Sequence, residues 1–416
     1  MQPQPPETAR QSLFPARFFG IAGACLVIGS VWLALQPEMF LAKSPDAPTL
    51  GWAYLVVVGT GLSAAFGACY ALGPGIFRTA ATRPAVMGAH FWVHLASILL
   101  MIPLFLQGGA GAVSHYWLVL YAIPLAFVVR IVFVLHNDPA PGPAPAFFRA
   151  AALWLAAALL AAMTITADAH WHFLRDGHWI AAVVPMVLVG VFANLLLGAA
   201  LAGAPQPGNP AAPRRPAWLA FILMNFGLAF LCNVLALGPA PLAVLCAAVL
   251  LAGVCVFGAG IVRSVRGTRL DVGSQMILMA AAIIFPAAAI GLLALRDEPV
   301  LPENASLLGN AFAAAAILGV IALGAIGALS AIGKSRFASR EGHPIAREIQ
   351  IAGYINYVVG ISVLVPGIGI HSDKAVSLGA FFLLMGVIAF LIHFLAMVRN
   401  PKRTGEEPAG AAIPSA

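Results

Sequence analysis

Long apolar stretches separated by short polar segments recur along the whole chain. A helix that crosses the hydrocarbon core of a membrane needs about 20 consecutive apolar residues, and twelve stretches approach or exceed this length. They lie at about 17–36, 51–74, 85–107, 115–135, 147–167, 178–203, 217–237, 240–263, 272–295, 306–332, 347–370 and 376–398. The pattern predicts an all-α polytopic membrane protein, a single integral membrane domain with twelve transmembrane helices.

The composition agrees with a membrane protein and excludes a soluble globular protein. Of the 416 residues, 61% are hydrophobic and 9% are charged, which no soluble domain of this size matches. The net charge of +7 comes from Lys and Arg at the predicted helix ends, so it gives no basis for a nucleic-acid partner. The expected partner is the lipid bilayer.

The distribution of basic residues predicts the orientation. If the N-terminus is inside, 18 Lys and Arg residues fall on the inner side and four on the outer side. Cytoplasmic loops carry an excess of Lys and Arg in membrane proteins. A single missed helix would destroy this bias, so the prediction is an even number of spans with both termini in the cytoplasm.

Three similar segments follow the second, sixth and tenth stretches and indicate an internal repeat. They read TRPAVMGA, RRPAWLAF and GHPIAREI, and their prolines are Pro84, Pro216 and Pro344. The spacings of 132 and 128 residues predict three blocks of four helices. The blocks cover about 1–140, 141–268 and 269–400, and residues 401–416 are expected to form a disordered tail.

Acidic residues are absent from the middle of every predicted span. All fifteen carboxylates lie in loops, tails or helix ends, and Glu348 is the closest to the membrane interior. Coupled transporters usually need a buried carboxylate or an unwound ion site. This pattern argues against an ion-coupled carrier and a membrane-embedded hydrolase, but it leaves a facilitator open.

Two histidines stand one helical turn apart in the stretch GAHFWVH, residues 88–94. His90 and His94 therefore share one face of the third predicted helix. One hypothesis is that one of them is an axial haem ligand with His393 as the opposite ligand. The other is that both form hydrogen bonds to neighbouring helices.

A second histidine cluster lies between the fifth and sixth predicted spans, in ADAHWHFLRDGHW. It contains His170, His172 and His178. Imidazole suits copper, iron and zinc, so one interpretation is a metal site or a site at a haem edge. The alternative is an aromatic belt at the membrane interface.

Several of these features resemble subunit I of the haem-copper oxidases, including the cbb-type oxidases and nitric oxide reductases. That family has twelve spans in a 4+4+4 arrangement with both termini inside. RDGHWIAAVVPMVLVG resembles the start of its sixth helix, where His178 matches a copper ligand, and LALGPAPLAVL resembles the end of its seventh helix. The adjacent copper-binding histidines of the seventh helix correspond to Ala240 and Pro241 here. The haem-ligating histidines of the family's second and tenth helices are also missing.

The resemblance therefore implies a divergent relative that is not a functional terminal oxidase. The leading hypothesis is a haem- or copper-associated or accessory subunit, respiratory or related to nitrosative stress, in a bacterial inner membrane and in contact with other respiratory subunits. NnrS-type membrane haem proteins are a second resemblance. Alternatives are a transporter or facilitator of a small solute and a structural membrane partner. Haem or copper is one expectation for a cofactor, and no cofactor is an equal one.

Overall fold

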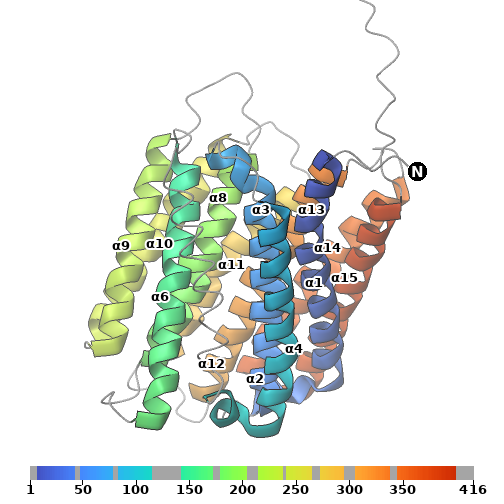
Figure 1. The fold of residues 1–416 in the computed structure, drawn as a ribbon. Coiled ribbons are helices and arrows are strands. Elements are labelled where there is room, and N and C mark those ends of the chain that lie inside the picture. Colours follow the sequence, from blue (N-terminus) through green and yellow to red (C-terminus); the bar gives the residue numbers. More distant parts are fainter. Residues whose placement is uncertain are drawn as a thin grey trace, which may run out of the picture.

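The computed structural model describes residues 7–42, 47–77, 83–114, 142–171, 179–203, 214–237, 240–264, 272–294, 305–337 and 344–399. This part of the chain is helical and contains no β-strand. Its helices stand side by side along roughly one direction, with α9 and α6 toward one edge of the view and α15 toward the other (Figure 1). The predicted all-α class is confirmed for these residues.

The first block begins with α1 (Glu7–Leu35) and the short 3-10 helix η1 (Pro37–Leu41). One span then consists of α2 (Ala47–Tyr54), η2 (Leu55–Leu62) and α3 (Ser63–Phe77), and α4 (Pro84–Ser114) follows. The middle of the chain forms α6 (Pro143–Trp171), a span of α7 (Trp179–Pro185), η3 (Met186–Ala193) and α8 (Asn194–Gly203), then α9 (Arg214–Leu237) and α10 (Ala240–Ser264). The last part forms α11 (Val272–Ala294), a span of α12 (Ala305–Ala314), η5 (Ala315–Ala322) and α13 (Leu323–Phe337), then α14 (Pro344–Gly369) and α15 (Asp373–Arg399).

Within the described residues, ten helical segments are long and apolar enough to cross a membrane, and α11 adds a shorter apolar segment, Val272–Ile284. Each of these eleven coincides with a predicted apolar stretch. The twelfth prediction, at 115–135, and the predicted tail at 401–416 lie outside the described residues. The multi-pass character predicted from hydropathy is confirmed.

Three spans contain a π-helical segment, which the sequence analysis did not anticipate. The segments are η2, η3 and η5, each of eight residues. In η3 and η5 the hydrogen bonds run to the fifth residue back, from Asn194 N–H to the Val189 carbonyl and from Leu323 N–H to the Leu318 carbonyl. Long π-helices are rare, and shorter π-bulges are often found at functional sites.

The three π-helices meet one another in the interior. A Cβ atom placed on Gly61 of η2 would lie 2.4 Å from Ile321 Cγ2 of η5 and 2.7 Å from Phe192 Cζ of η3. All three residues are buried. The absence of a side chain at Gly61 is therefore what allows the three central spans to approach this closely.

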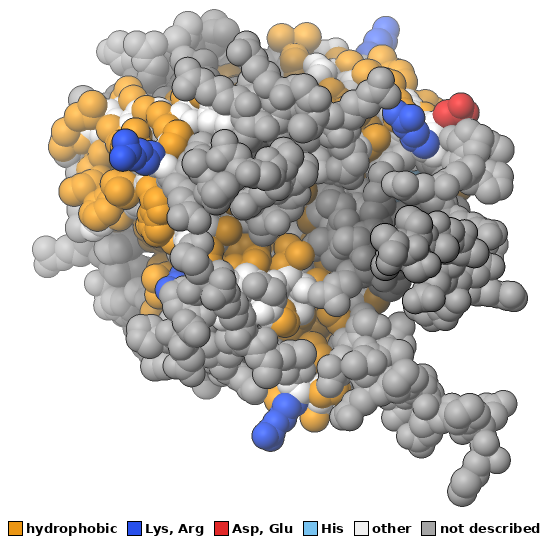
Figure 2. Space-filling model, turned by 90° about the horizontal axis from the view of Figure 1, so that it is seen from above, with side chains coloured by type: hydrophobic (Ala, Val, Ile, Leu, Met, Phe, Trp, Pro, Cys, Tyr) orange, Lys and Arg blue, Asp and Glu red, His pale blue; other side chains and the backbone are white. Residues whose placement is uncertain are grey.

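Arginines gather at one end of the bundle. α1 packs antiparallel to the span of η2 and α3, because Phe19 lies against Gly67 of α3 while Cys25 lies against Gly59 of η2. Similar glycine contacts orient the other central spans, so the arginines with described side chains share the end at which α1 begins; these are Arg17, Arg83, Arg149, Arg215 and Arg347. Lys374, at the start of α15, lies at the opposite end. Seen from that end, Lys and Arg side chains lie mostly near the rim, beside apolar groups (Figure 2).

The α14–α15 pair forms a tight antiparallel hairpin. The backbone closes it at Ile370–Ser372: Ser372 N–H donates to the Gly367 carbonyl, and His371 has a positive φ of 53°. Along the hairpin, a Cβ on Gly360 would lie 2.7 Å from Leu383 N, and one on Gly379 would lie 2.6 Å from Leu364 N. Glycines thus place one helix backbone directly on the other, as small residues do in membrane helix pairs.

Candidate functional site

The histidine pair in α4 faces α3, and each imidazole has a polar partner there. His94 Nε2 lies 2.8 Å from the Ser63 hydroxyl, and His90 Nδ1 lies 3.0 Å from the Tyr70 hydroxyl. Both histidines are buried, with exposed fractions of 7% for His90 and 4% for His94. A polar group in the membrane interior needs a partner from the protein, since lipid offers none. Ser63 and Tyr70 supply those partners.

Aromatic rings surround the same pair. The Phe66 ring centroid lies 4.5 Å from the His90 centroid and 5.1 Å from the His94 centroid. On the α1 side, the Phe18 centroid lies 5.2 Å from that of His90 and 6.2 Å from that of His94. Phe91 packs edge-on against Phe18. These rings enclose both imidazoles from the α1 and α3 sides.

His393 lies in a different environment. It is buried in α15 and lines a pocket together with Phe19 of α1 and Ser330 of α13. The neighbouring residue of α1, Phe18, packs instead against His90 and His94. The structure therefore brings His90 and His94 together but associates His393 with another face of α1.

The second predicted cluster cannot be placed from the structure. His172 and His178 lie outside the described residues. His170 belongs to α6, but its side chain is not among those described. Within the described residues, no group of three or more His, Cys, Asp or Glu is arranged to hold a metal ion. The metal-site interpretation of His170, His172 and His178 stays a prediction.

A second polar cluster, between α6, α8 and α9, was missed by the sequence analysis; Asn194 is fully buried, and Trp154 and Asn225 are half-buried. Trp154 Nε1 donates to Asn225 Oδ1 at 2.8 Å, and Asn225 Nδ2 donates to Asn194 Oδ1 at 3.2 Å. Asn194, the residue that directly follows η3, also donates a hydrogen bond from Nδ2 to the carbonyl of Gly190 within η3, at 2.9 Å. The Asn194 side chain thus occupies a backbone acceptor of the π-helix and ties it to the neighbouring span.

The sequence positions of the glycines could have indicated this cluster. Gly59 and Gly190 hold the same position in η2 and η3, and His94 and Asn225 each follow their glycine by 35 residues. Ser63 and Asn194 each follow it by four. Ser63–His94 in the first block and Asn194–Asn225 in the second block therefore join the second and third spans of their blocks at equivalent positions. Each pair can hold two helices together, and neither supplies a carboxylate or a thiol.

We expect His94→Ala to lower the free energy of unfolding by an amount on the order of 1 kcal/mol, because a buried interhelical hydrogen bond in a membrane protein contributes about 0.6 kcal/mol on average. Ser63→Ala and the double variant complete a cycle that isolates the pair. The measurement is unfolding in mixed micelles. Single effects that simply add would show that the Ser63–His94 contact contributes nothing.

Comparison with known proteins gives no relative from which a function can be transferred. The sequence matches no protein-family model, and no curated protein resembles it at a significant level. Arguments about function therefore rest on the residues and the geometry described above.

Proposed function

We propose that the chain is an accessory subunit of a respiratory or nitrosative-stress-related assembly in a bacterial inner membrane. In this proposal it has the twelve-span, 4+4+4 organisation of a haem-copper-oxidase-like protein, with both termini in the cytoplasm. It reduces no oxygen, and it holds no haem between His90 or His94 and His393. Its role is to bind and stabilise redox-active subunits.

The spacing of the π-helices supports the threefold organisation. Gly59, Gly190 and Gly319 hold the same position within η2, η3 and η5, at intervals of 131 and 129 residues. A second glycine follows each of them by eight residues, as Gly67, Gly198 and Gly327 do. These intervals agree with the proline spacings of 132 and 128 to within one residue, and each π-helix lies in the second span of its block.

An even number of spans also has support from the described helices. α4 and α6 both begin at the basic end of the bundle, which agrees with the span predicted between them at 115–135. The arginines at that end agree with the excess of basic residues in cytoplasmic loops. On this basis the basic end is the cytoplasmic one.

The main support for a role without redox chemistry is the way in which the three π-helices pack against one another. In the family that the chain resembles, the second, sixth and tenth helices supply metal and haem ligands. The corresponding spans here meet through Gly61, Phe192 and Ile321, none of which has a side chain that can bind a metal. His90 and His94 are hydrogen-bonded to Tyr70 and Ser63 and enclosed by phenylalanines.

The test is a reduced-minus-oxidised spectrum of the purified full chain, together with its iron and copper content. We expect no α band or Soret band, and no oxygen consumption with an electron donor above a no-protein control. In the source bacterium, deletion of the gene should lower the amount of an assembled respiratory complex, and the wild-type gene should restore it. A stoichiometric haem that is lost in both His90→Ala and His393→Ala would overturn the proposal, as would unchanged assembly of every respiratory complex after deletion.

A further inference from the structure

A pocket opens between α1, α13 and α15, away from both polar clusters. It is a shallow pocket: the empty space among its lining residues is about 480 Å³, but this volume includes space outside the protein surface, and the enclosed part is much smaller. Leu391, one of its lining residues, is 36% exposed. Because this surface belongs to helices long and apolar enough to span a membrane, we expect the opening to face lipid. A molecule dissolved in the bilayer could therefore reach the pocket without crossing water.

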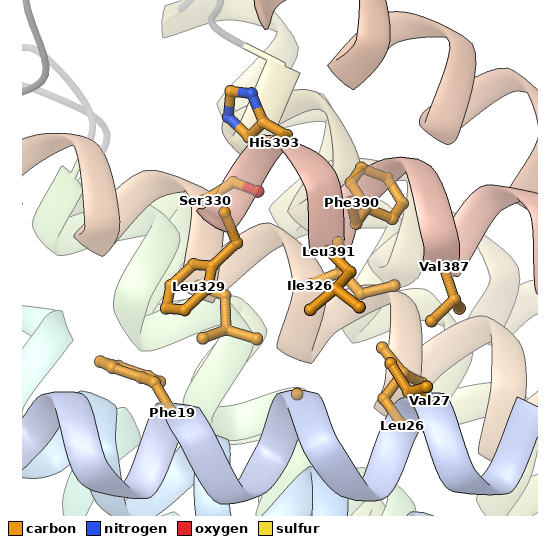
Figure 3. A pocket seen from close by; sticks show the side chains of 12 residues that line it. Phe19, Leu26, Val27, Ile326, Leu329, Ser330, Val387, Phe390, Leu391 and His393 are labelled. Atoms are coloured by element: carbon orange, nitrogen blue, oxygen red, sulfur yellow. The ribbon is translucent and has the colours of Figure 1, made fainter. Parts of the chain in front are cut away.

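The pocket is polar at one end and apolar at the other. His393 stands two residues before the end of the apolar span of α15, and Ser330 is the last residue of the span that includes α13. Apart from Phe394, which follows His393, most of the lining, including Leu26 and Val387, lies deeper in the spans. Figure 3 shows His393 and Ser330 away from Leu26, Val27 and Val387. An amphipathic molecule would fit with its head at the membrane interface and its chain inward.

The residues that line the pocket also restrict which head group the bound molecule can have. Among the described residues that line the pocket there is no Lys, Arg, Asp or Glu, so these residues offer no countercharge for a phosphate or an ammonium group. Three phenylalanines, Phe19, Phe390 and Phe394, contribute to the wall, and aromatic side chains favour contact with a flat ring. The two polar groups, a hydroxyl and an imidazole, can each donate a hydrogen bond.

We infer that this pocket binds a lipid-phase molecule of the quinone class, with its uncharged ring beside Ser330 and His393 and its apolar chain along α1. Quinone carbonyl oxygens accept hydrogen bonds from the serine hydroxyl and an imidazole N–H. The inference rests on the pocket and goes beyond the proposed function. It can therefore be tested independently of a role as an accessory subunit.

Two glycines on α1 provide a matched pair of variants for the test. Gly23 lines the pocket, and a Cβ added there meets nothing within 4 Å. Gly20 also has nothing within 4 Å of an added Cβ, but it is exposed and does not line the pocket. Leucine at position 23 fills the pocket, whereas leucine at position 20 extends into lipid.

The experiment uses the purified full chain in lipid nanodiscs and a photoreactive short-chain benzoquinone as the probe. We expect saturable labelling of peptides from α1 or α15, with competition by the unlabelled short-chain quinone. Gly23→Leu should weaken labelling by about tenfold, while Gly20→Leu should keep it within about twofold of the wild type. Ser330→Ala and His393→Ala should each weaken it without removing it, and thermal unfolding verifies that every variant is folded.

Three outcomes would overturn the inference. The first is labelling that does not saturate, and the second is equal labelling of the Gly23→Leu and Gly20→Leu proteins. The third is a phospholipid that copurifies with the wild type, as detected by mass spectrometry, and is lost in Gly23→Leu while quinone labelling is unchanged. If Gly23→Leu fails to fold, the inference is tested by quinone labelling of Gly23→Ala and of the Ser330 and His393 variants.

Discussion

Replacement of Gly61 by alanine is expected to destabilise the bundle by about 3 kcal/mol, at the upper end of the usual cost of overpacking an interior. The added methyl group would lie 2.4 Å from Ile321 Cγ2 and 2.7 Å from Phe192 Cζ. Both neighbours are buried and belong to other π-helices, so neither side chain can turn into open space. The three central spans would have to move apart.

The control is Gly73→Ala, further along the same span in α3, where an added Cβ has no neighbour within 4 Å. Unfolding in mixed micelles should separate the two variants clearly. Combining Gly61→Ala with Ile321→Ala should recover part of the lost stability, because the closest clashing atom is removed. Equal stability of the Gly61 and Gly73 variants would show that the central spans do not meet in this way.

The second large effect is expected in the α14–α15 hairpin. In Gly379→Ala, the new methyl group would lie 2.6 Å from the Leu364 amide nitrogen and 2.8 Å from its Cα. A backbone atom cannot rotate away as a side chain does, so the two helices must separate. We expect a loss of about 2 kcal/mol or more in the free energy of unfolding.

Gly369→Ala in the same hairpin is the matched control, since nothing lies within 4 Å of a Cβ at that position. An engineered cysteine pair across the hairpin would report the separation independently, through slower disulfide formation in Gly379→Ala. A Gly379→Ala protein that unfolds like the Gly369→Ala protein would contradict the close backbone contact.

The positions of the spans could be predicted because length and hydropathy are local properties of the chain. The same apolar runs contain the π-helices, and this feature was not predicted. LVVVGTGL and MVLVGVFA are ordinary apolar membrane sequences, and their wider hydrogen bonding depends on neighbouring spans. Only a comparison of the glycine positions across the blocks marks these segments as equivalent.

The histidine site was predicted in part. Helical periodicity placed His90 and His94 on one face, and one of the two hypotheses was that both form hydrogen bonds to neighbouring helices. The particular partners, Ser63 and Tyr70, depend on how α3 packs on α4, which a single sequence does not reveal. The pocket at His393 was not predicted at all, because α1, α13 and α15 are far apart in the chain.

The π-helices also restrict how this chain can change in length. Deleting one residue from η3 would rotate everything beyond it by about 100° relative to the preceding part of the span. Asn194 would then turn away from Asn225, even though hydropathy and span length would be almost unchanged. Sequences related to this one should therefore tolerate many apolar exchanges within these segments, whereas single-residue insertions or deletions there should be rare unless a second length change nearby restores the rotation.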